Sequence, residues 1–332
     1  MKINREQCKV SVVIPCYNQA PTLERAIRSA LNQTLPPAEV IVVDDGSTDG
    51  SRHVADSFGS AIIFKQQQNR GPAAARNLGV CSATGEFLCF LDADDWWQPE
   101  FAACCSDFLM AHPTCIAVST GLCFVQSDGS CAYGPADCFD GNKPLGLPRV
   151  LESFFAFWAE HDHVCTGSVL ARREAIVKVG MQNESLRAAE DLEFWALLGA
   201  HGKWGFIPEP LWVCDSRRAA GGQRGRLQKD QRRMKTVPSI PQWEARILPQ
   251  MRSEDLPYYR RIRGKVATSL AFSKIMLGQD DQALQVVRSY AEDLCEASNA
   301  GRRFQTAAKL GPPAWLALCA ALRIRRRLQC LW

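Results

Sequence analysis

Two clusters of carboxylates stand directly after runs of apolar residues in this sequence. Val40–Val43 is followed by Asp44-Asp45, and Phe87–Leu91 is followed by Asp92-Ala93-Asp94-Asp95. Runs of β-branched and aromatic residues without alternation are typical of strands buried on both faces of a parallel sheet. Ligands of such sheets bind beyond the carboxyl ends of the strands, where Asp-x-Asp suits a hard divalent cation that also holds a diphosphate. The sequence therefore predicts metal and phosphate chemistry at one edge of a sheet.

Strand and helix patterns alternate around these clusters. Apolar runs predict strands at residues 10–14, 40–43, 61–64 and 86–91. Residues at helical spacing predict helices from about Thr22 to 31, from about Ser47 to 58, and over 72–81. This order predicts an α/β fold with a doubly wound, mostly parallel sheet flanked by helices.

The rest of the chain divides by composition near residue 216. Residues 1–216 carry 16 Lys/Arg and 26 Asp/Glu, whereas residues 217–332 carry 23 and 9. We therefore expect a catalytic domain at 1–216 and a basic, mainly helical region at 217–332. Further elements are expected as a helix at 101–111, a strand at 116–119, a hairpin turning at 127–129, helices near 151–160, 173–179 and 192–198, and a helix pair at 270–279 and 283–294.

The basic C-terminal region predicts an anionic partner or an anionic membrane surface. Nucleic acid is not expected, because no zinc-finger, RNP-type or basic-zipper pattern accompanies the basic residues. Near the chain end, Trp315 lies in an apolar run that precedes Arg323–Arg327, a pattern that fits peripheral membrane contact. A terminal helix packed on its own domain, with a solvated basic face, is the alternative.

The cysteines indicate a reducing compartment. The 15 cysteines include no Cys-x-x-Cys pair, and Cys89, Cys104 and Cys123 lie inside apolar runs, where a thiol behaves as a small hydrophobe. The polar residues 1–9 lack the pattern of a signal peptide, and the apolar stretch at 314–322 is too short to span a bilayer. We therefore expect a cytoplasmic protein, peripheral to the inner face of the membrane if the basic region binds there, and no structural zinc site.

Five motifs follow one another along the chain. They are Val12-Val13-Ile14-Pro15-Cys16-Tyr17-Asn18, Val43-Asp44-Asp45-Gly46-Ser47-Thr48-Asp49, Gly71-Pro72-Ala73-Ala74-Ala75-Arg76-Asn77, Leu91-Asp92-Ala93-Asp94-Asp95 and Glu190-Asp191. In this order they resemble family 2 of the glycosyltransferases, inverting enzymes of the GT-A fold. The resemblance covers roughly residues 10–215, and five ordered motifs are far more specific than any one of them. It implies transfer of a sugar from a nucleoside diphosphate donor, usually UDP-linked, to a hydroxyl acceptor on a glycan or lipid-linked sugar, with Mg²⁺ or Mn²⁺ as cofactor and a role in cell-surface polysaccharide or glycolipid synthesis.

For the nucleotide end of the donor, the resemblance implies that Asp45, with Asp44 beside it, accepts from the base. The alternative for these aspartates is to cap the helix that follows. Pro15 and Tyr17, at the end of the first strand, would wall the nucleotide, although ordinary packing is an equal alternative for Tyr17.

For the diphosphate, Asp94 would bind the metal directly, and Asp92 would share the metal or face the sugar or ribose. An aspartate-rich turn is the alternative for this pair. Arg76 would neutralise the pyrophosphate or brace the aspartates, as opposed to lying on the surface.

For the acceptor, the resemblance implies that Asp191 of the Glu190-Asp191 pair is the general base that deprotonates the hydroxyl. Acidic residues in a first helical turn also stabilise the helix dipole, so capping is the alternative. Trp195 either lines the acceptor pocket or belongs to the core.

One departure from the family pattern concerns a histidine. The family often has Tyr-Arg-x-His after a segment like residues 207–211, whereas this chain reads Trp212-Val213-Cys214-Asp215 and then Arg217-Arg218. We expect one of these arginines to supply the missing positive charge, on a loop that Gly221-Gly222 would let close. His161-Asp162-His163 has metal-like spacing without an evident third ligand, and we expect a surface loop there.

Two other functions compete with glycosyl transfer. A nucleotidyltransferase on a similar sheet would need a Gly-rich, basic loop after the first strand, where this chain has Cys16-Tyr17-Asn18-Gln19. A non-catalytic sugar-nucleotide-binding protein would bind the donor and show neither transfer nor slow donor hydrolysis.

Overall fold

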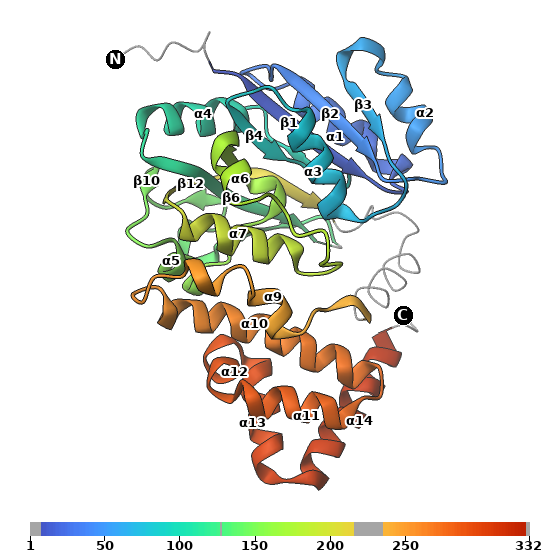
Figure 1. Cartoon of the computed structure of the whole chain (residues 1–332), viewed down its shortest axis with the longest axis vertical. Coiled ribbons are helices and arrows are strands. Elements are labelled where there is room, and N and C mark those ends of the chain that lie inside the picture. Colours follow the sequence, from blue (N-terminus) through green and yellow to red (C-terminus); the bar gives the residue numbers. More distant parts are fainter. Residues whose placement is uncertain (1–7, 127, 216–234, 330–332) are drawn as a thin grey trace. The chain divides into compact units, whose positions relative to one another are not determined.

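A computed structural model describes residues 8–126, 128–215 and 235–329 of the chain (Figure 1). The chain forms two compact units, one of residues 1–185 and 190–225 and the other of residues 186–189 and 226–332. We call them the α/β unit and the helical unit. The domain boundary expected between residues 216 and 217 lies outside the described residues.

Within the described residues, the α/β unit contains a ten-stranded sheet. Its strands are β1 (Val10–Cys16), β2 (Glu39–Asp44), β3 (Ile63–Gln66), β4 (Phe87–Phe90), β5 (Asp95–Trp97), β6 (Cys115–Val125), β7 (Cys131–Gly134), β10 (Arg149–Val150), β11 (Val169–Arg172) and β12 (Lys203–Asp215). The order is β10-β12-β6-β11-β4-β1-β2-β3, with β5 beside β12 and β7 beside β6. Neighbours from β3 to β4 are parallel, as are β6 and β12, whereas β11 runs antiparallel between β4 and β6. The expected mostly parallel α/β sheet is confirmed.

Seven α-helices are described in this unit. They are α1 (Ala20–Leu31), α2 (Ser51–Asp56), α3 (Pro72–Ser82), α4 (Phe101–Ala111), α5 (Phe154–Glu160), α6 (Arg173–Lys178) and α7 (Glu190–Ala200). Two of them start elsewhere than expected. α1 begins at Ala20, not near Thr22, because the Asp49 carboxylate of a neighbouring loop accepts from the Ala20 amide at 3.1 Å. α2 begins at Ser51, not near Ser47, because the Asp49 carboxylate also accepts from the Ser51 amide, at 2.9 Å.

Several strands also depart from the sequence-based expectations. β3 begins at Ile63, not at residue 61, because a 3₁₀ turn at Gly59–Ala61 takes up the preceding residues. β6 extends to Val125 because β7 pairs with its second half, which confirms the hairpin expected around residues 127–129. β5 and the long β12 were not expected from the sequence.

The central strands are buried on both faces, which explains their unbroken apolar runs. Val12 and Ile14 of β1 belong to a buried cluster that includes residues of α1 and α4. On the other face α3 comes so close that a Cβ on Gly79 would lie 2.2 Å from Val13. Burial on both faces removes the alternation that marks a half-exposed strand.

The described residues of the helical unit are 186–189 and 235–329. Its helices are α9 (Ile240–Glu244), α10 (Leu256–Met276), α11 (Asp280–Ser289), α12 (Ala291–Ala297), α13 (Asn299–Leu310) and α14 (Pro312–Gln329). The helix expected over 283–294 is interrupted at Tyr290, where α11 ends and α12 begins. Arg263 of α10 pairs with Asp293 at 2.7 Å and with Glu244 at 3.5 Å, so this unit balances its buried charges internally.

Trp315 does not face outward from the helical unit. Its side chain is 2% exposed, packs edge-on against Phe304 and donates from Nε1 to the Asp280 carbonyl at 3.1 Å. Arg323 forms a two-pronged ion pair with the same Asp280. The packed-helix alternative therefore describes the tryptophan face of α14. Of the helices in the described residues, none is long and apolar enough to cross a bilayer.

Candidate active site

Asp45, directly after β2, fixes the loop that leads into α3. It is 3% exposed and accepts from the backbone amides of Arg70 and Gly71, each at 2.8 Å. Gln67 Nε2 donates to it at 2.7 Å. The capping alternative for α2 is therefore wrong for this residue, because its carboxylate holds the start of a different helix. A base could still reach remaining lone pairs, since a carboxylate offers about four acceptor positions.

Asp44, the last residue of β2, shapes its own turn. Its carboxylate accepts from the Ser47 amide at 3.1 Å and from Gln66 Nε2 at 3.0 Å, and the residue is 1% exposed. Gly46 in that turn has φ +76°, and a Cβ there would lie 2.9 Å from the Asn69 amide nitrogen. Only glycine fits both demands.

Pro15 and Tyr17 lie at the end of β1, next to this turn. Pro15 is in register with Val43 in the parallel β1–β2 ladder. Tyr17 is 40% exposed, so it is not packed in the core. Asn18 then accepts from the Thr48 amide at 2.8 Å and ties the two loops together. The structure thus presents Tyr17 to solvent at the edge where β2 ends.

Arg76 of α3 joins two acidic motifs that lie far apart in the sequence. It is 4% exposed, which rules out the surface alternative. Its guanidinium pairs with Asp92 at 2.9 Å and with Glu190 at 3.3 Å, and it donates to Gln182 Oε1 at 3.1 Å. Burial acts to lower the pKa of Arg76, but the charges of Asp92, Glu190 and Asp191 outweigh it and raise that pKa. Arg76 therefore braces the aspartate cluster.

The three aspartates after β4 are crowded. Asp92 and Asp94 are partly exposed, whereas Asp95 is 5% exposed at the start of β5. Burial raises the pKa of Asp95 well above its ordinary value, and the charges of Asp94 and Asp92 raise it further. Arg25 of α1 donates a hydrogen bond to the Asp94 backbone carbonyl at 2.7 Å. Its guanidinium carbon lies 3.9 Å from the centroid of the Trp96 ring, a cation–π contact.

Residues of β12 and of the loop before β11 complete this edge, and sequence reasoning had not assigned them to the site. Trp212 Nε1 donates to Asp95 at 3.1 Å, and the Cys214 thiol also bonds to that carboxylate. Burial raises the pKa of the Cys165 thiol, and the charges of Asp191, Asp95, Asp162 and Asp92 add to that rise. Cys165 and Cys214 therefore belong to the surroundings of the acidic cluster. The tight β5–β12 pairing, with Asp95 opposite Cys214, is a tertiary feature that no local pattern encodes.

Glu190 and Asp191 open α7 beside Arg76. Glu190 is 8% exposed, and burial followed by the charge of Asp191 raises its pKa, against the opposing effect of Arg76. Asp191 is more accessible, and its Oδ1 accepts from the Leu192 amide at 2.8 Å. The pair is thus divided into a buried, braced carboxylate and a more open one.

Trp195, one turn further along α7, is a core residue. It is 1% exposed and packs with Phe90 and Trp204, with ring centroids 6.5 and 6.3 Å apart. It anchors α7 to β4 and does not line an acceptor pocket.

The carboxylates of Asp92 and Asp94 are the groups that could hold a divalent cation. Their oxygens are hard ligands of the kind that Mg²⁺ and Mn²⁺ prefer. Burial is the main cause of the raised pKa of Asp95, and the charges of Asp94 and Asp92 add a repulsion that a cation would relieve. Arg76 already engages Oδ1 of Asp92, so diphosphate oxygens and water would have to supply further ligands. The donor set therefore fits a cation shared with a diphosphate.

The expected substitutes for the missing histidine, Arg217 and Arg218 with Gly221-Gly222, lie outside the described residues. The strand that leads to them ends at Asp215, whose buried carboxylate pairs with Arg25 at 3.6 Å. Of the two histidines with metal-like spacing, His163 is fully buried and bonded to Ser119 Oγ at 2.7 Å, so it is a core residue. His161 instead lies close to Asp137 and Cys138, a cluster that the sequence analysis did not predict.

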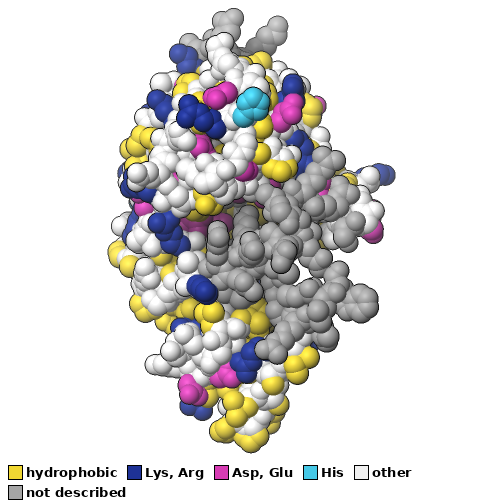
Figure 2. All heavy atoms as spheres, turned by 90° about the vertical axis from the view of Figure 1, so that its right-hand side faces the viewer, with side chains coloured by type: hydrophobic (Ala, Val, Ile, Leu, Met, Phe, Trp, Pro, Cys, Tyr) yellow, Lys and Arg dark blue, Asp and Glu magenta, His cyan; other side chains and the backbone are white. Residues whose placement is uncertain are grey.

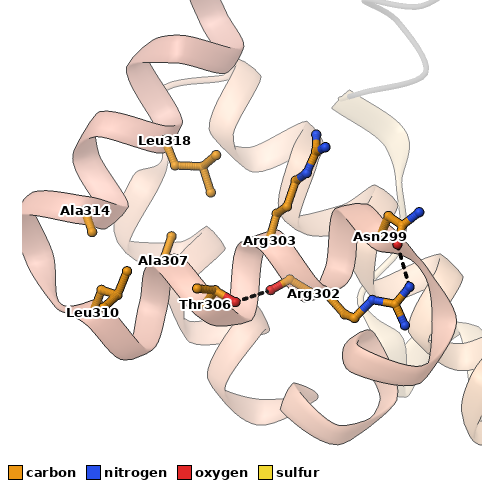
Figure 3. Close-up of a pocket in the computed structure, with 8 residues that line it drawn as sticks. All are labelled: Asn299, Arg302, Arg303, Thr306, Ala307, Leu310, Ala314 and Leu318. Atoms are coloured by element: carbon orange, nitrogen blue, oxygen red, sulfur yellow. Dashed lines mark hydrogen bonds between the residues drawn. The ribbon is translucent and has the colours of Figure 1, made fainter.

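A separate pocket of about 640 Å³ lies between α13 and α14 of the helical unit (Figure 3). Its lining combines apolar side chains with two arginines, of which Arg302 donates to Asn299 at 2.5 Å. No carboxylate lines it within the described residues, so it lacks the chemistry of the acidic edge. The lining residues are Asn299, Arg302, Arg303, Thr306, Ala307, Leu310, Ala314 and Leu318.

Comparisons with known proteins agree with this fold. The Staphylococcus aureus protein TarS (residues 1–349) superposes with a TM-score of 0.54 at 17% identity, over 90% of this chain and 91% of that one. TarS has also been solved in complex with UDP-GlcNAc and with UDP, each at 16% identity to this chain. At this level of identity the likeness shows the fold, and it confirms the GT-A type architecture with a helical C-terminal region.

The sequence relatives include proteins described as glycosyltransferases and a protein described by polysaccharide biosynthesis. The putative teichuronic acid biosynthesis glycosyltransferase TuaG of Bacillus subtilis is 30% identical over 193 residues, covering 57% of this chain and 71% of TuaG. The succinoglycan biosynthesis protein ExoU of Rhizobium meliloti is 31% identical over 206 residues, 58% of this chain and 57% of ExoU. The chain matches only 18% of the length of glycosyltransferase GlyA from Streptococcus pneumoniae, at 32% identity over 36% of this chain. The model of glycosyl transferase family 2 matches residues 11–180, half of the chain, and we conclude that the chain belongs to this family.

Proposed function

We propose that this protein transfers a sugar from a nucleoside diphosphate donor, UDP-linked, to a hydroxyl acceptor with inversion. The observation that carries the proposal is the bridge of Arg76 between Asp92 and Glu190. It puts the acids that would face the diphosphate and the acids that would face the acceptor into one charge network. The complexes of TarS with UDP-GlcNAc and UDP support a UDP-linked donor.

The nucleotide would lie at the ends of β1 and β2. Tyr17 and Pro15 would wall it, and Asp45, with Asp44 beside it, would accept from the base. Because Asp45 already accepts three N–H groups, its orientation is held before any ligand arrives. A preorganised acceptor of this kind costs little conformational entropy on binding.

The transfer step needs a base and a stabilised leaving group. Asp191, the more open acid of α7, would take the proton of the acceptor hydroxyl as it attacks the sugar opposite the diphosphate, and a single displacement of this kind inverts the anomeric centre. Asp94 and Asp92 would hold Mg²⁺ or Mn²⁺, which when bound would offset the charge that develops on the departing diphosphate. Arg76 and Glu190 would keep Asp92 and Asp191 in place.

The acceptor class is proposed from the relatives. TuaG and ExoU are described by teichuronic acid and succinoglycan biosynthesis, both polysaccharide pathways. A glycan or lipid-linked sugar acceptor in cell-surface polysaccharide or glycolipid synthesis is consistent with these descriptions. A cytoplasmic location would supply such an enzyme with its nucleotide-sugar.

Peripheral contact with an anionic membrane is proposed for the helical unit. Because Trp315 is buried, the proposal rests on other, exposed apolar side chains. Apolar side chains gather at the lower end of this unit in Figure 2. Large exposed apolar side chains of α13 and α14 include Leu310 (72%) and Leu316 (55%), and Arg302 and Arg303 line the neighbouring pocket. We expect the protein to sediment with phosphatidylglycerol vesicles but not with phosphatidylcholine vesicles. The double variant Leu310→Ser/Leu316→Ser should no longer sediment with phosphatidylglycerol. Equal sedimentation of the wild type and the double variant would contradict this proposal.

Calorimetric binding of UDP and UDP-GlcNAc, with and without Mn²⁺, tests the donor site. We expect Mn²⁺-dependent UDP binding that weakens by about tenfold or more in Asp94→Asn, because an amide is a poorer ligand for a hard cation than a carboxylate. Asp56→Asn is the matched control, since Asp56 is an exposed residue of α2 paired only with Arg52 in the ion pairs of the described residues. Absence of nucleoside diphosphate binding under all conditions would overturn the proposal.

A donor-hydrolysis assay separates the enzyme from a non-catalytic binding protein. Slow release of free sugar from UDP-GlcNAc, abolished in Asp191→Asn while UDP still binds, is expected of a transferase. Tight donor binding without hydrolysis or transfer would favour the binding protein. A nucleotidyltransferase would release diphosphate from a nucleoside triphosphate, and the β1–α1 loop offers no basic side chain for that phosphate chain.

A further inference from the structure

Three side chains with metal-binding atoms converge on one surface of the α/β unit, away from the strand-end aspartates. Asp137 and Cys138 lie in a 3₁₀ turn (Ala136–Cys138), and His161 follows the last residue of α5. One ligand atom from each, a carboxylate oxygen, Sγ and a ring nitrogen, lie within 4.8 Å of one another. More than twenty residues separate the two segments, so the fold and not the local sequence makes this cluster.

The geometry of the cluster is close to that of a zinc site. His161 Nδ1 lies 2.8 and 2.9 Å from the two carboxylate oxygens of Asp137. Ligands of a tetrahedral Zn²⁺ stand about 3.3–3.8 Å apart, because the bonds measure about 2.0–2.3 Å. Movements of about an ångström, on an exposed carboxylate and a partly exposed imidazole, would therefore admit the ion.

We propose that Asp137, Cys138 and His161 bind one Zn²⁺ ion, at a site distinct from the donor-metal site. The donor set of thiolate, imidazole and carboxylate selects a borderline-soft transition metal and discriminates against Mg²⁺ and Ca²⁺. Three protein ligands leave a fourth position for water.

The surroundings of His161 favour ligation through Nδ1. Its other nitrogen, Nε2, lies 3.9 Å from a carboxylate oxygen of Glu160. A zinc-bound histidine commonly donates its remaining N–H to a carboxylate, which fixes the tautomer and the ring orientation. The ring is also held by Phe157, with centroids 4.3 Å apart.

Cys138 brings its sulfur to the cluster from a buried position. Burial and the charge of Asp137 raise the pKa of its thiol, and Arg149, which donates a hydrogen bond to the sulfur, only partly offsets that rise. Zinc binding must therefore displace the thiol proton, so the affinity should rise with pH.

The ion would tie the 3₁₀ turn to the end of α5. That junction leads, four residues after His161, to Cys165, whose thiol lies within electrostatic reach of Asp191 and Asp95. Zinc would therefore steady a segment that borders the acceptor side of the proposed active site. We expect a rise in Tm of about 5 °C at saturating Zn²⁺, because a ligand that binds only the folded state stabilises it.

Cobalt substitution tests the site in the full chain. Chelator-treated, TCEP-reduced protein is titrated with Co²⁺ in excess Mg²⁺, and the near-ultraviolet thiolate-to-cobalt band is followed; bound Zn²⁺ is then counted by elemental analysis. We expect one equivalent of either metal, loss of the thiolate band in Cys138→Ser, and at least a tenfold weaker Zn²⁺ affinity in His161→Gln.

Matched controls separate this site from other thiols and from the donor site. Cys131→Ser, an exposed cysteine of β7, and Asp94→Asn should both keep the band and the stoichiometry. Circular dichroism of the metal-free variants confirms that each is folded. A band that persists in Cys138→Ser, or Zn²⁺ binding equal in wild type and in a folded His161→Gln, would overturn the proposal, as would no binding at all. UDP binding is measured in parallel, so failure here leaves the donor site standing.

Discussion

Similar acidic motifs follow β2 and β4, but the groups that surround their carboxylates differ. At the end of β2, Asp44 and Asp45 are buried and accept from neutral N–H donors of the turn after β2, of β3 and of the loop between β3 and α3. At the end of β4, burial and then the charges of Asp94 and Asp92 raise the pKa of Asp95, and Arg76 pairs with Asp92. The acids of the first cluster are held by neutral donors, whereas those of the second crowd one another, and we propose that a cation binds there.

We propose that this difference separates aspartates that position the nucleotide from aspartates that hold a metal. Neutral donors stabilise a buried carboxylate and hold its position, which suits recognition of a nucleobase. Crowded carboxylates repel one another, and a cation that arrives with the diphosphate would lower that repulsion. The variants below test each side of the comparison.

Arg76→Met should have the largest effect. Removing the guanidinium leaves Asp92 and buried Glu190 without their shared partner, and breaking a buried ion pair costs about 3–5 kcal/mol. Urea unfolding followed by circular dichroism measures the loss. Arg52→Met, whose arginine is 60% exposed and paired with Asp56, should cost less than about 1 kcal/mol. Equal losses in the two variants would show that Arg76 braces nothing.

Asp191→Asn should lower kcat by about 10²–10⁴-fold, the range expected when a general base is removed. The Kd for UDP should not change, because Asp191 is proposed to face the acceptor and not the donor. Steady-state transfer and calorimetry on the same preparation check both values, with Asp56→Asn as the control. A variant that keeps its full turnover would assign the base to another residue.

Asp45→Asn should destabilise the protein by about 1–3 kcal/mol. The amide group would turn one N–H donor toward the Arg70 or Gly71 amide, leaving a buried donor without an acceptor. Urea unfolding measures the loss, and UDP calorimetry asks whether affinity falls with it. A stable variant with weakened UDP binding would mean that Asp45 serves the ligand more than the loop.

Glu190→Gln should show the smallest effect, a change in the pH dependence of stability. The pKa of Glu190 in the folded protein is raised above 4.5 by burial and by Asp191, so its contribution is fully present below the unfolded pKa and is lost as pH rises through the folded one. Glutamine does not titrate. The stability of the variant relative to wild type should therefore rise as pH increases above 4.5.

Glu39→Gln is the control for which the pH dependence of stability should have the opposite sign. Burial acts to raise the pKa of Glu39, but hydrogen bonds from Ser11 and Thr84 outweigh it and lower that pKa. This group stabilises the fold above its unfolded pKa, so the variant should lose stability relative to wild type as pH rises. Urea midpoints between pH 3.5 and 7 check both slopes, and parallel slopes would contradict the assigned directions.

Where local pattern and environment agreed, prediction from the sequence succeeded. The helix expected at 101–111 has those bounds, because its apolar residues pack in the core of the unit. The predicted start of α1 was wrong because Asp49, a residue of another loop, accepts the hydrogen bond of the Ala20 amide. β12 was missed because Pro208 and Pro210 interrupt its pattern, and the pairing with β6 shifts register there. The roles of the site residues stay predictions.

The order of motifs was enough to indicate the family, the parallel sheet and the acids at the ends of its strands, because buried strands and strand-end ligands leave local signatures. Only the tertiary structure decided that Arg76 joins Asp92 to Glu190, that Trp195 belongs to the core, and that His161 meets Asp137 and Cys138 and not His163. The physical reason is that charge pairing and ligand convergence depend on distances between segments far apart in the chain. No local pattern of residues encodes those distances.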